Sequence, residues 1–209
     1  MPRVLPMLCV AIVLATDVSA QEAKPIVPAV RGFQLGADGA AAVLRSDYVT
    51  GGRRVAGGGF GLRLGWGIHD HVVLAMDVAA TKLVVADTAD YFLAHADMLL
   101  RVLPFRIESG LGTWLPFVQV GGGWRNVEDD KASPTGTNIY IFEGGVFTLG
   151  VGTHLYLADE ASLFLGWYHS RGDFDDERIG NTTTHNRNQP GRSSRLQMGV
   201  TWHLSRDPN

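Results

Sequence analysis

The stretch Gly57-Gly-Gly-Phe-Gly-Leu-Arg-Leu-Gly-Trp-Gly-Ile68 decides the fold of this chain of 209 residues. Large apolar side chains occupy every second position from Phe60 to Ile68, and glycines and Arg63 occupy the positions between them. Successive side chains of a strand point to opposite faces, so this strand has one large apolar face and one nearly bare face. A soluble sheet turns its large apolar face inward. Small and polar residues suit a narrow interior instead, so the pattern is typical of a transmembrane β-barrel strand with its apolar face toward lipid.

Seven further segments show a two-residue alternation, and none shows a sustained helical period. The sequence therefore predicts an all-β fold, an eight-stranded antiparallel up-and-down transmembrane β-barrel. Most segments are near the roughly 9–11 residues that a tilted strand needs to cross a bilayer. The predicted strands are Gly32–Leu44, Ala56–Ile68, His71–Leu83, Tyr91–Leu103, Leu115–Arg125, Ile141–Leu157, Ala161–Arg171 and Arg195–Leu204.

The predicted connections between these strands are long on one side and short on the other. Arg45–Val55, Asn126–Asn138 and Gly172–Ser194 are long, whereas His69-Asp70 and Ala158–Glu160 are tight turns. The segment Pro104–Trp114 is longer than this rule allows. Outer-membrane barrels have short periplasmic turns and long outer loops, so the long connections are expected on the cell surface.

The N-terminus predicts export. Arg3 precedes an apolar run from Val4 to Ala15, and Val18-Ser19-Ala20 forms a small-x-small cleavage pattern, which is typical of a secretory signal peptide. The apolar run is shorter than the roughly 20 residues of a spanning helix. We therefore divide the chain into a signal peptide (1–20), a periplasmic N-terminal segment (21–31), a β-barrel (32–204) and a C-terminal tail (205–209). Cys9 is the only cysteine, so the mature chain has no disulfide.

Polar residues are expected to line the interior of the barrel. The lumen of an eight-stranded barrel is just wide enough for side chains to fill, and buried charges must be paired. We therefore expect an internal network of ion pairs and hydrogen bonds, with a proton or ion path as the alternative. His95 and Asp97 could together bind a metal, but two ligands do not make a site, so no metal and no cofactor are expected. The inward residues are Arg63, Asp77, His95, Asp97, Arg101, Gln119, Tyr156, Tyr168, Arg195 and Gln197.

The tryptophans are expected at the two membrane–water interfaces. There the apolar ring of an indole can contact lipid while its N–H group finds a hydrogen-bond partner. Trp66, Trp114 and Trp202 lie near predicted periplasmic strand ends, whereas Trp124 and Trp167 lie toward the outer ends.

Three segments resemble the small OmpA-like, opacity-type outer-membrane β-barrel superfamily: Gly59–Leu74, Pro116–Gly123 and Leu149–Leu165. The resemblance covers nearly the whole mature chain and concerns the barrel rather than a chemistry. It implies an eight-stranded barrel in the outer membrane of a Gram-negative bacterium, inserted by the barrel-assembly machinery. That family often ends on an aromatic residue, whereas here five residues follow Leu204.

The function expected from these features is that of a monomeric outer-membrane barrel that acts structurally and through its outer loops, as a surface antigen would. Its expected partners are the bilayer and lipopolysaccharide, and the net charge of −3 argues against nucleic acid. No catalytic site is expected.

Three alternatives remain open. A lipid A deacylase would need an activated serine. His169 and Ser170 invite that idea, but as adjacent strand residues they face opposite sides. The second alternative is a narrow pore or carrier of small solutes. The third is a soluble periplasmic barrel that binds a ligand.

Overall fold

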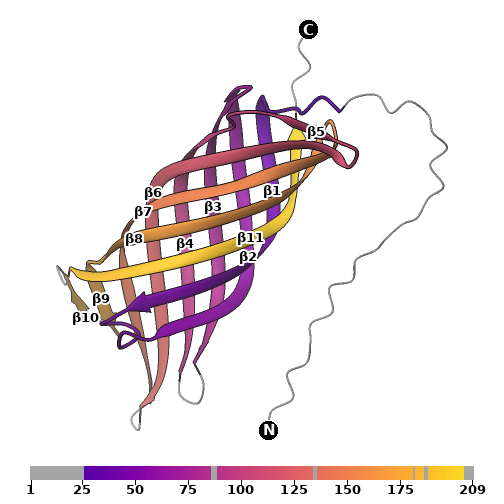
Figure 1. The fold of residues 1–209 in the computed structure, drawn as a ribbon. Helices are drawn as coiled ribbons and strands as arrows, with labels where there is room; N and C mark the ends of the chain where they lie inside the picture. The colour runs from indigo at the N-terminus through magenta and orange to yellow at the C-terminus, as the bar shows by residue number, and fades with distance from the viewer. Residues whose placement is uncertain (1–25, 86–88, 134–135, 181, 186–187, 205–209) are drawn as a thin grey trace, which may run out of the picture.

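The computed structural model of the protein describes residues 26–85, 89–133, 136–180, 182–185 and 188–204 (Figure 1). The predicted signal peptide and the tail 205–209 lie outside these residues. Within them, no helix has both the length and the apolar character needed to cross a membrane.

Eight long strands form one closed antiparallel sheet. Each strand pairs with the next along the chain, and the last pairs with the first, which closes the barrel. The predicted eight-stranded up-and-down barrel is therefore confirmed. Its strands are β1 (Gly32–Ser46), β2 (Arg54–His69), β3 (Val72–Val85), β4 (Ala89–Val102), β6 (Gly112–Ser133), β7 (Gly136–Ala158), β8 (Ala161–Phe174) and β11 (Gln189–Leu204).

The two ends of the barrel differ. Tight turns at residues 70–71 and 159–160 mark one end, here called the turn end, where the short strand β5 (Ile107–Ser109) also pairs with the start of β6. The opposite end, the loop end, carries β9 (Asp176–Ile179) and β10 (Thr182–Thr184), which extend the sheet beside β7. Figure 1 shows β5 and the β9–β10 pair at opposite ends of the molecule.

The prediction of a loop at Asn126–Asn138 is wrong. β6 and β7 remain paired from Thr113↔Tyr156 as far as Ser133↔Gly136, so this segment is almost entirely strand. The alternation of large apolar side chains stops near Trp124, but the backbone ladder needs no apolar side chains to continue. A strand end estimated from hydrophobicity therefore marks the end of the apolar surface and not the end of the sheet.

The predicted loop Gly172–Ser194 is also mostly strand. β8 continues to Phe174, β11 begins at Gln189, and β9 and β10 lie between them. The loop Arg45–Val55 shortens to residues 47–53 for the same reason, because Arg45 pairs with Arg54 across β1 and β2.

Side chains alternate between the interior and the outer surface as the sequence pattern predicts. Leu62, Leu64 and Met198 are exposed on the outside, whereas Asp77 and Gln197 are buried inside. Apolar residues therefore cover the outer face of the barrel, and the charged residues between them lie within it.

The interior has three layers, which can be followed along β3. Val73 and Ala75 lie at the turn end, Asp77 lies in the middle, and Leu83 lies at the loop end, all buried. Two apolar clusters of buried residues thus enclose a polar layer. The turn-end cluster contains Val30, Val73, Leu99, Leu115, Phe117, Tyr156 and Phe164, and the loop-end cluster contains Leu44, Leu83, Leu93, Val127, Phe142 and Phe174.

The segment 26–31 runs across the turn end before β1 begins. The backbone N–H groups of Val27 and Ala29 donate to the Asp159 side chain and carbonyl at 2.9 and 3.1 Å. Thr113 donates to the carbonyl of Ile26, and Val30 is buried in the turn-end cluster. This segment thus covers the interior at that end.

Candidate functional site

Arg63 organises the centre of the polar layer. Its guanidinium donates to Asp38 Oδ2 at 2.6 Å and to Thr201 Oγ1 at 3.0 Å, and it lies 3.4 Å from Asp77 Oδ1. The Phe164 ring covers one face of the guanidinium, with its centroid 3.2 Å from Cζ. Because Arg63 and Asp77 are direct cross-strand partners, the register of β2 and β3 builds this ion pair.

A second ion pair crosses the lumen. Arg195 of β11 pairs with Asp97 of β4, and both side chains are fully buried. Three strands separate β11 from β4 around the sheet, so this pair ties opposite walls together. Thr148 Oγ1 donates to the second oxygen of Asp97 at 3.0 Å and bonds to Ser170 Oγ at 2.8 Å. Both oxygens of the Asp97 carboxylate thus have partners within the protein, as a buried charge requires.

A chain of hydrogen bonds runs among the side chains of the turn-end cluster, since Arg101 is level with Val73 and His203 is one residue from the end of β11. Arg101 donates to Gln119 Oε1 at 2.9 Å and to His154 Nε2 at 3.2 Å. Ser162 Oγ then bridges His154 and His203, at 3.0 Å from each ring. Tyr156 bonds to the other nitrogen of His203. Because an arginine can only donate, His154 accepts through Nε2 and carries its proton on Nδ1.

Buried charges of both signs occur along the interior. Its central and turn-end parts hold three carboxylates and three guanidinium groups, and Arg125, Asp129 and Glu177 are buried toward the loop end: the first six are Asp38, Asp77, Asp97, Arg63, Arg101 and Arg195.

The other predicted interior residues lie in the same lumen. Tyr168 is buried 5.2 Å from the Arg195 guanidinium, and Gln197 is buried as well. His95 bonds to Ser193 at 3.1 Å, while Asp97 is engaged by Arg195. No group of three metal-ligating side chains occurs in the described part of the chain.

The tryptophans lie on the outer face. Trp66, Trp124, Trp167 and Trp202 are each about half exposed, and Trp114 is partly buried with its indole N–H donating to Ser109. Trp66 and Trp202 lie within three residues of the turn-end termini of β2 and β11. Trp124 lies inside β6, which continues nine residues beyond it to Ser133.

His169 and Ser170 do not form a pair. Ser170 points into the lumen, where it bonds to Thr148, and His169 lies on the outer face. There His169 meets Ser194, its cross-strand partner on β11, with Nδ1 and Oγ 3.1 Å apart. An activated serine also needs an oriented base and an oxyanion hole. His169 and Ser170 therefore do not form the activated pair that the deacylase alternative requires, and among the described residues His169 has no carboxylate partner.

Several interior residues escape the sequence-based prediction. Asp38 lies in Gly32–Ser46, where three consecutive alanines blur the alternation, although its position two residues before Ala40 on the buried face could have identified it. His154 and His203 share the parity of predicted interior neighbours on their strands. Arg125 is buried where the predicted strand ends and stacks 4.1 Å from the Phe174 ring.

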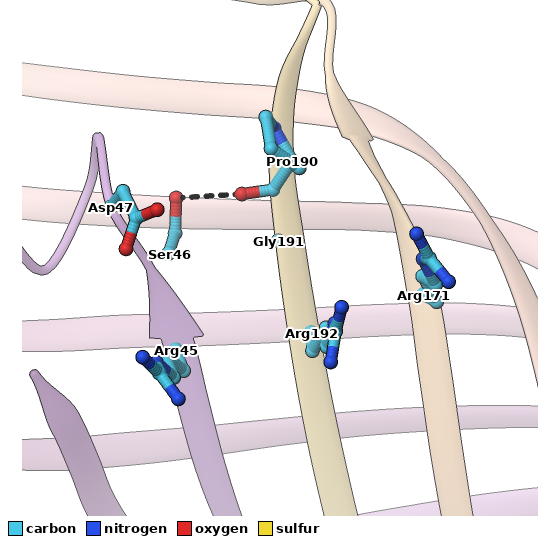
Figure 2. A pocket seen from close by; sticks show the side chains of 7 residues that line it. All are labelled: Arg45, Ser46, Asp47, Arg171, Pro190, Gly191 and Arg192. Carbon is cyan, nitrogen blue, oxygen red and sulfur yellow. Dashed lines mark hydrogen bonds between the residues drawn. The ribbon is translucent and has the colours of Figure 1, made fainter. Parts of the chain in front are cut away.

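Four arginines on the outer face at the loop end are also missed, because the sequence places them in loops or at a strand end. Arg54, Arg45, Arg192 and Arg171 lie on four adjacent strands, and each is the direct cross-strand partner of the next. We call them the arginine row. Figure 2 shows three of them, projecting from β1, β11 and β8 around a shallow pocket.

The fold was compared with known proteins. No family model and no curated protein sequence matches this chain. Among solved structures, Neisserial surface protein A has a TM-score of 0.60 at 16% identity and covers 83% of this chain and 97% of its own. OprG from Pseudomonas aeruginosa has a TM-score of 0.55 at 10% identity, with coverages of 88% and 100%.

A third similar structure is Ail, the attachment invasion locus protein of Yersinia pestis, solved in complex with the heparin analogue sucrose octasulfate. It has a TM-score of 0.51 at 10% identity and covers 82% of this chain and 99% of its own. At these identities the likeness concerns the fold. The chain thus has the fold of the small eight-stranded outer-membrane β-barrels.

Proposed function

We propose that this protein is an integral barrel of the outer membrane, exported by its N-terminal signal peptide, with a closed interior. One observation carries the proposal: large apolar side chains cover the outer face of the strands between the turn end and the level of the arginine row, while Arg63 and Arg195 lie in the lumen, paired with carboxylates. Such an inverted distribution is unfavourable in water, because contiguous apolar surface is left exposed. In a bilayer the same surface is solvated by lipid.

The outer face also changes from apolar to polar partway along the strands toward the loop end. On β8 the outward residues from the turn end are Leu163, Leu165 and Trp167, followed by His169 and Arg171. β7 is 23 residues long, far more than the roughly 9–11 residues that a bilayer requires. The strands therefore extend beyond the apolar band at the loop end, which would stand on the cell surface.

The interior supports a structural role rather than transport. The ion-paired layer lies between two apolar clusters, and the segment 26–31 covers the turn end. An ion crossing this lumen would have to displace the pair of Arg195 and Asp97 and pass apolar side chains at both ends. The loop end is then the surface available for binding. Its partners would be lipopolysaccharide and ligands outside the cell. The surface and attachment roles in the names of the similar structures agree with this assignment.

The first test compares two substitutions whose effects on stability depend on whether the outer face is in contact with lipid or with water. Leu64→Arg places a charge in the apolar band of β2, and Ala56→Arg places the same charge on the same face near the loop end. In a bilayer an arginine at the midplane costs about 2–4 kcal/mol and near the interface about 0–1 kcal/mol. We expect urea unfolding from lipid vesicles to show this difference. A soluble barrel would tolerate both changes equally, and equal tolerance would overturn the proposal.

The second test separates a closed barrel from a pore. Folded protein is identified by its shifted migration on a detergent gel before boiling, and is then added to a planar bilayer. We expect no conductance steps from the wild type, whereas steady channels from protein that is verified as folded would contradict a closed interior.

The third test concerns the deacylase alternative. Membranes from cells that carry His169→Ala or Ser194→Ala should keep the same lipid A acylation pattern as wild type. A change in either variant would instead favour a deacylase.

A further inference from the structure

The arginine row is unusual because like charges face one another across three successive strand pairs. Arg54 pairs with Arg45, Arg45 with Arg192, and Arg192 with Arg171. Directly opposed residues on one face have Cβ atoms about 4.5–5.5 Å apart, and like charges at these positions are destabilising. All four side chains are exposed on the outer face.

The chain itself supplies little countercharge to this row. Among the described residues, none of the four arginines forms an ion pair, whereas Arg31, Arg106 and Arg178, which are also exposed, each have a carboxylate partner. The nearby carboxylates, Asp47 and Asp173, lie two residues beyond Arg45 and Arg171, toward the loop end. The row therefore leaves positive charge on this surface that no ion pair among the described residues balances, and this charge is available to an anionic ligand.

Two cavities adjoin the row and share Arg45 and Arg192. The first, of about 210 Å³, is also lined by Arg171, Ser46 and Asp47, so it holds three cations against one carboxylate (Figure 2). The second, of about 340 Å³, is also lined by Arg54, His169 and Ser194 and holds three cations and no carboxylate. Two adjacent cavities that are rich in positive charge and share a pair of guanidinium groups would suit a ligand that carries two anionic groups.

The second cavity is continuous with the apolar face. Val43 forms part of its wall, and one step further toward the turn end the outward residues on β11 and β8 are Leu196 and Trp167, both exposed. A ligand seated here would thus have its anionic groups at the arginines and its remainder against apolar side chains. A free anion or a soluble polyanion would make no use of that second surface.

We propose that the arginine row binds the headgroup of a lipid that carries two phosphate groups, in the outer leaflet of the membrane. The proposal rests on the proposed function, since it needs the loop end to lie at the membrane surface. Guanidinium groups bind phosphate oxygens in a bidentate manner. The Arg45 and Arg192 pair would lie between the two phosphates, with Arg171 completing one position and Arg54 the other. His169 and Ser194 would offer hydrogen bonds beneath the second phosphate.

The test uses the folded mature chain in micelles of an uncharged detergent. The probes are bisphosphorylated lipid A, monophosphorylated lipid A, inorganic phosphate and sucrose octasulfate, and bound molecules are counted by native mass spectrometry. We compare the double variant Arg45→Gln/Arg192→Gln with the matched control Arg53→Gln/Arg178→Gln, which removes the same charge from the same end of the barrel.

We expect bisphosphorylated lipid A to bind the wild type and the control equally, and the double variant at least tenfold more weakly, which corresponds to about 1.4 kcal/mol. Removing one phosphate should also weaken binding. Equal binding of the double variant and the control would overturn the site. Inorganic phosphate or sucrose octasulfate binding as tightly as the lipid would overturn the lipid as its ligand.

The heat-modifiable gel shift is measured on every variant. A barrel that folds and inserts into vesicles but ignores the lipid would contradict this inference alone, and a chain that does not insert would contradict the proposed function.

Discussion

The arginines inside the barrel and those of the arginine row lie on opposite faces of the sheet, with one of each on β2 and on β11, and their charges are compensated in different ways. Arg63 and Arg195 are buried, and each has a carboxylate of the chain within its reach. Arg45 and Arg192 are exposed and face each other. The residue type is the same, so the parity of the strand position decides whether the protein or its surroundings must supply the opposite charge.

This difference also separates two roles of charge. Inside, an ion pair is a structural element, because a buried charge loses its hydration and is unfavourable unless a partner replaces it. Outside, an uncompensated charge is tolerated because solvent and ions are present, and it remains available to a ligand. The following predictions test this contrast, from the largest expected effect to the smallest.

The largest effect is expected when one partner of the cross-barrel pair is removed. Arg195→Met leaves Asp97 buried without its countercharge, and breaking a buried pair in this way costs about 3–5 kcal/mol. The measurement is the free energy of unfolding in urea from detergent micelles. The double variant Arg195→Met/Asp97→Asn should recover part of the loss, because the stranded charge is gone. A loss below about 1 kcal/mol in the single variant would show that the lumen solvates the carboxylate.

A smaller loss of stability is expected when a methyl group is added in the lumen beside the ion pair of Asp38 and Arg63. A Cβ at Gly61 would lie 2.4 Å from Asp38 Oδ1 and 2.8 Å from Gln197 Nε2, so Gly61→Ala must displace Asp38, which pairs with Arg63. Overpacking of this kind costs about 1–3 kcal/mol. Gly58→Ala is the control on the outer face of the same strand, where the nearest atom is 3.8 Å away. Thermal unfolding of both variants should separate them, and equal midpoints would contradict a tightly filled interior.

The opposite sign is expected at the arginine row. Arg45→Glu places a carboxylate between Arg54 and Arg192, turning two repulsive cross-strand pairs into two attractive ones. Each pair contributes roughly 0.2–1 kcal/mol, so the variant should be more stable than wild type in an uncharged detergent. Arg53→Glu, in the neighbouring turn, is the control and should show no such gain. A variant less stable than wild type would mean that the row is already neutralised by the chain.

The smallest effect is expected at the exposed pair of the turn end. Arg31 donates to Asp70 at 2.7 Å, and this hydrogen bond lowers the pKa of Asp70 below its usual 3.8. A carboxyl whose pKa is lower in the folded state stabilises the fold above its usual pKa, and that stability is lost as the pH falls through the folded value. Arg31→Gln should therefore be slightly less stable than wild type at pH 7.

The two proteins should then converge as the pH falls below 3.8. Because the pair is exposed, added salt should reduce the difference at pH 7 as well. Asp70→Asn is the matching variant from the other side, and it should remove the pH dependence. A difference that grows at low pH would contradict this sign.

The fold could be predicted from the sequence because parity is a local property. The alternation of Leu62, Arg63 and Leu64 already shows which face of β2 is apolar, and the closed sheet follows from eight such segments. Strand ends could not be predicted in this way, since the ladder continues through residues such as Asn126 and Arg192 that carry no apolar signal.

The interior residues could be predicted as a group but not as partners. Parity points Asp97 and Arg195 into the lumen, but they are 98 residues apart and meet across the barrel. Which side chains reach one another depends on the stagger of the strands around the closed sheet, and no single segment contains that information. The arginine row depends on the same register, so it emerges only from the assembled sheet.

The closing pair of strands has a consequence for any experiment that attaches something to this protein. Phe33 pairs with Leu204, so the first and last strands of the barrel begin and end side by side at the turn end. In the orientation proposed above, a reporter joined to the chain before Val27 of the mature protein or after Leu204 would be on the periplasmic side. An epitope meant for detection on intact cells would have to be inserted at the opposite pole, and the connection at residues 47–53 offers an exposed position there at Gly51, which has a positive φ of 59°.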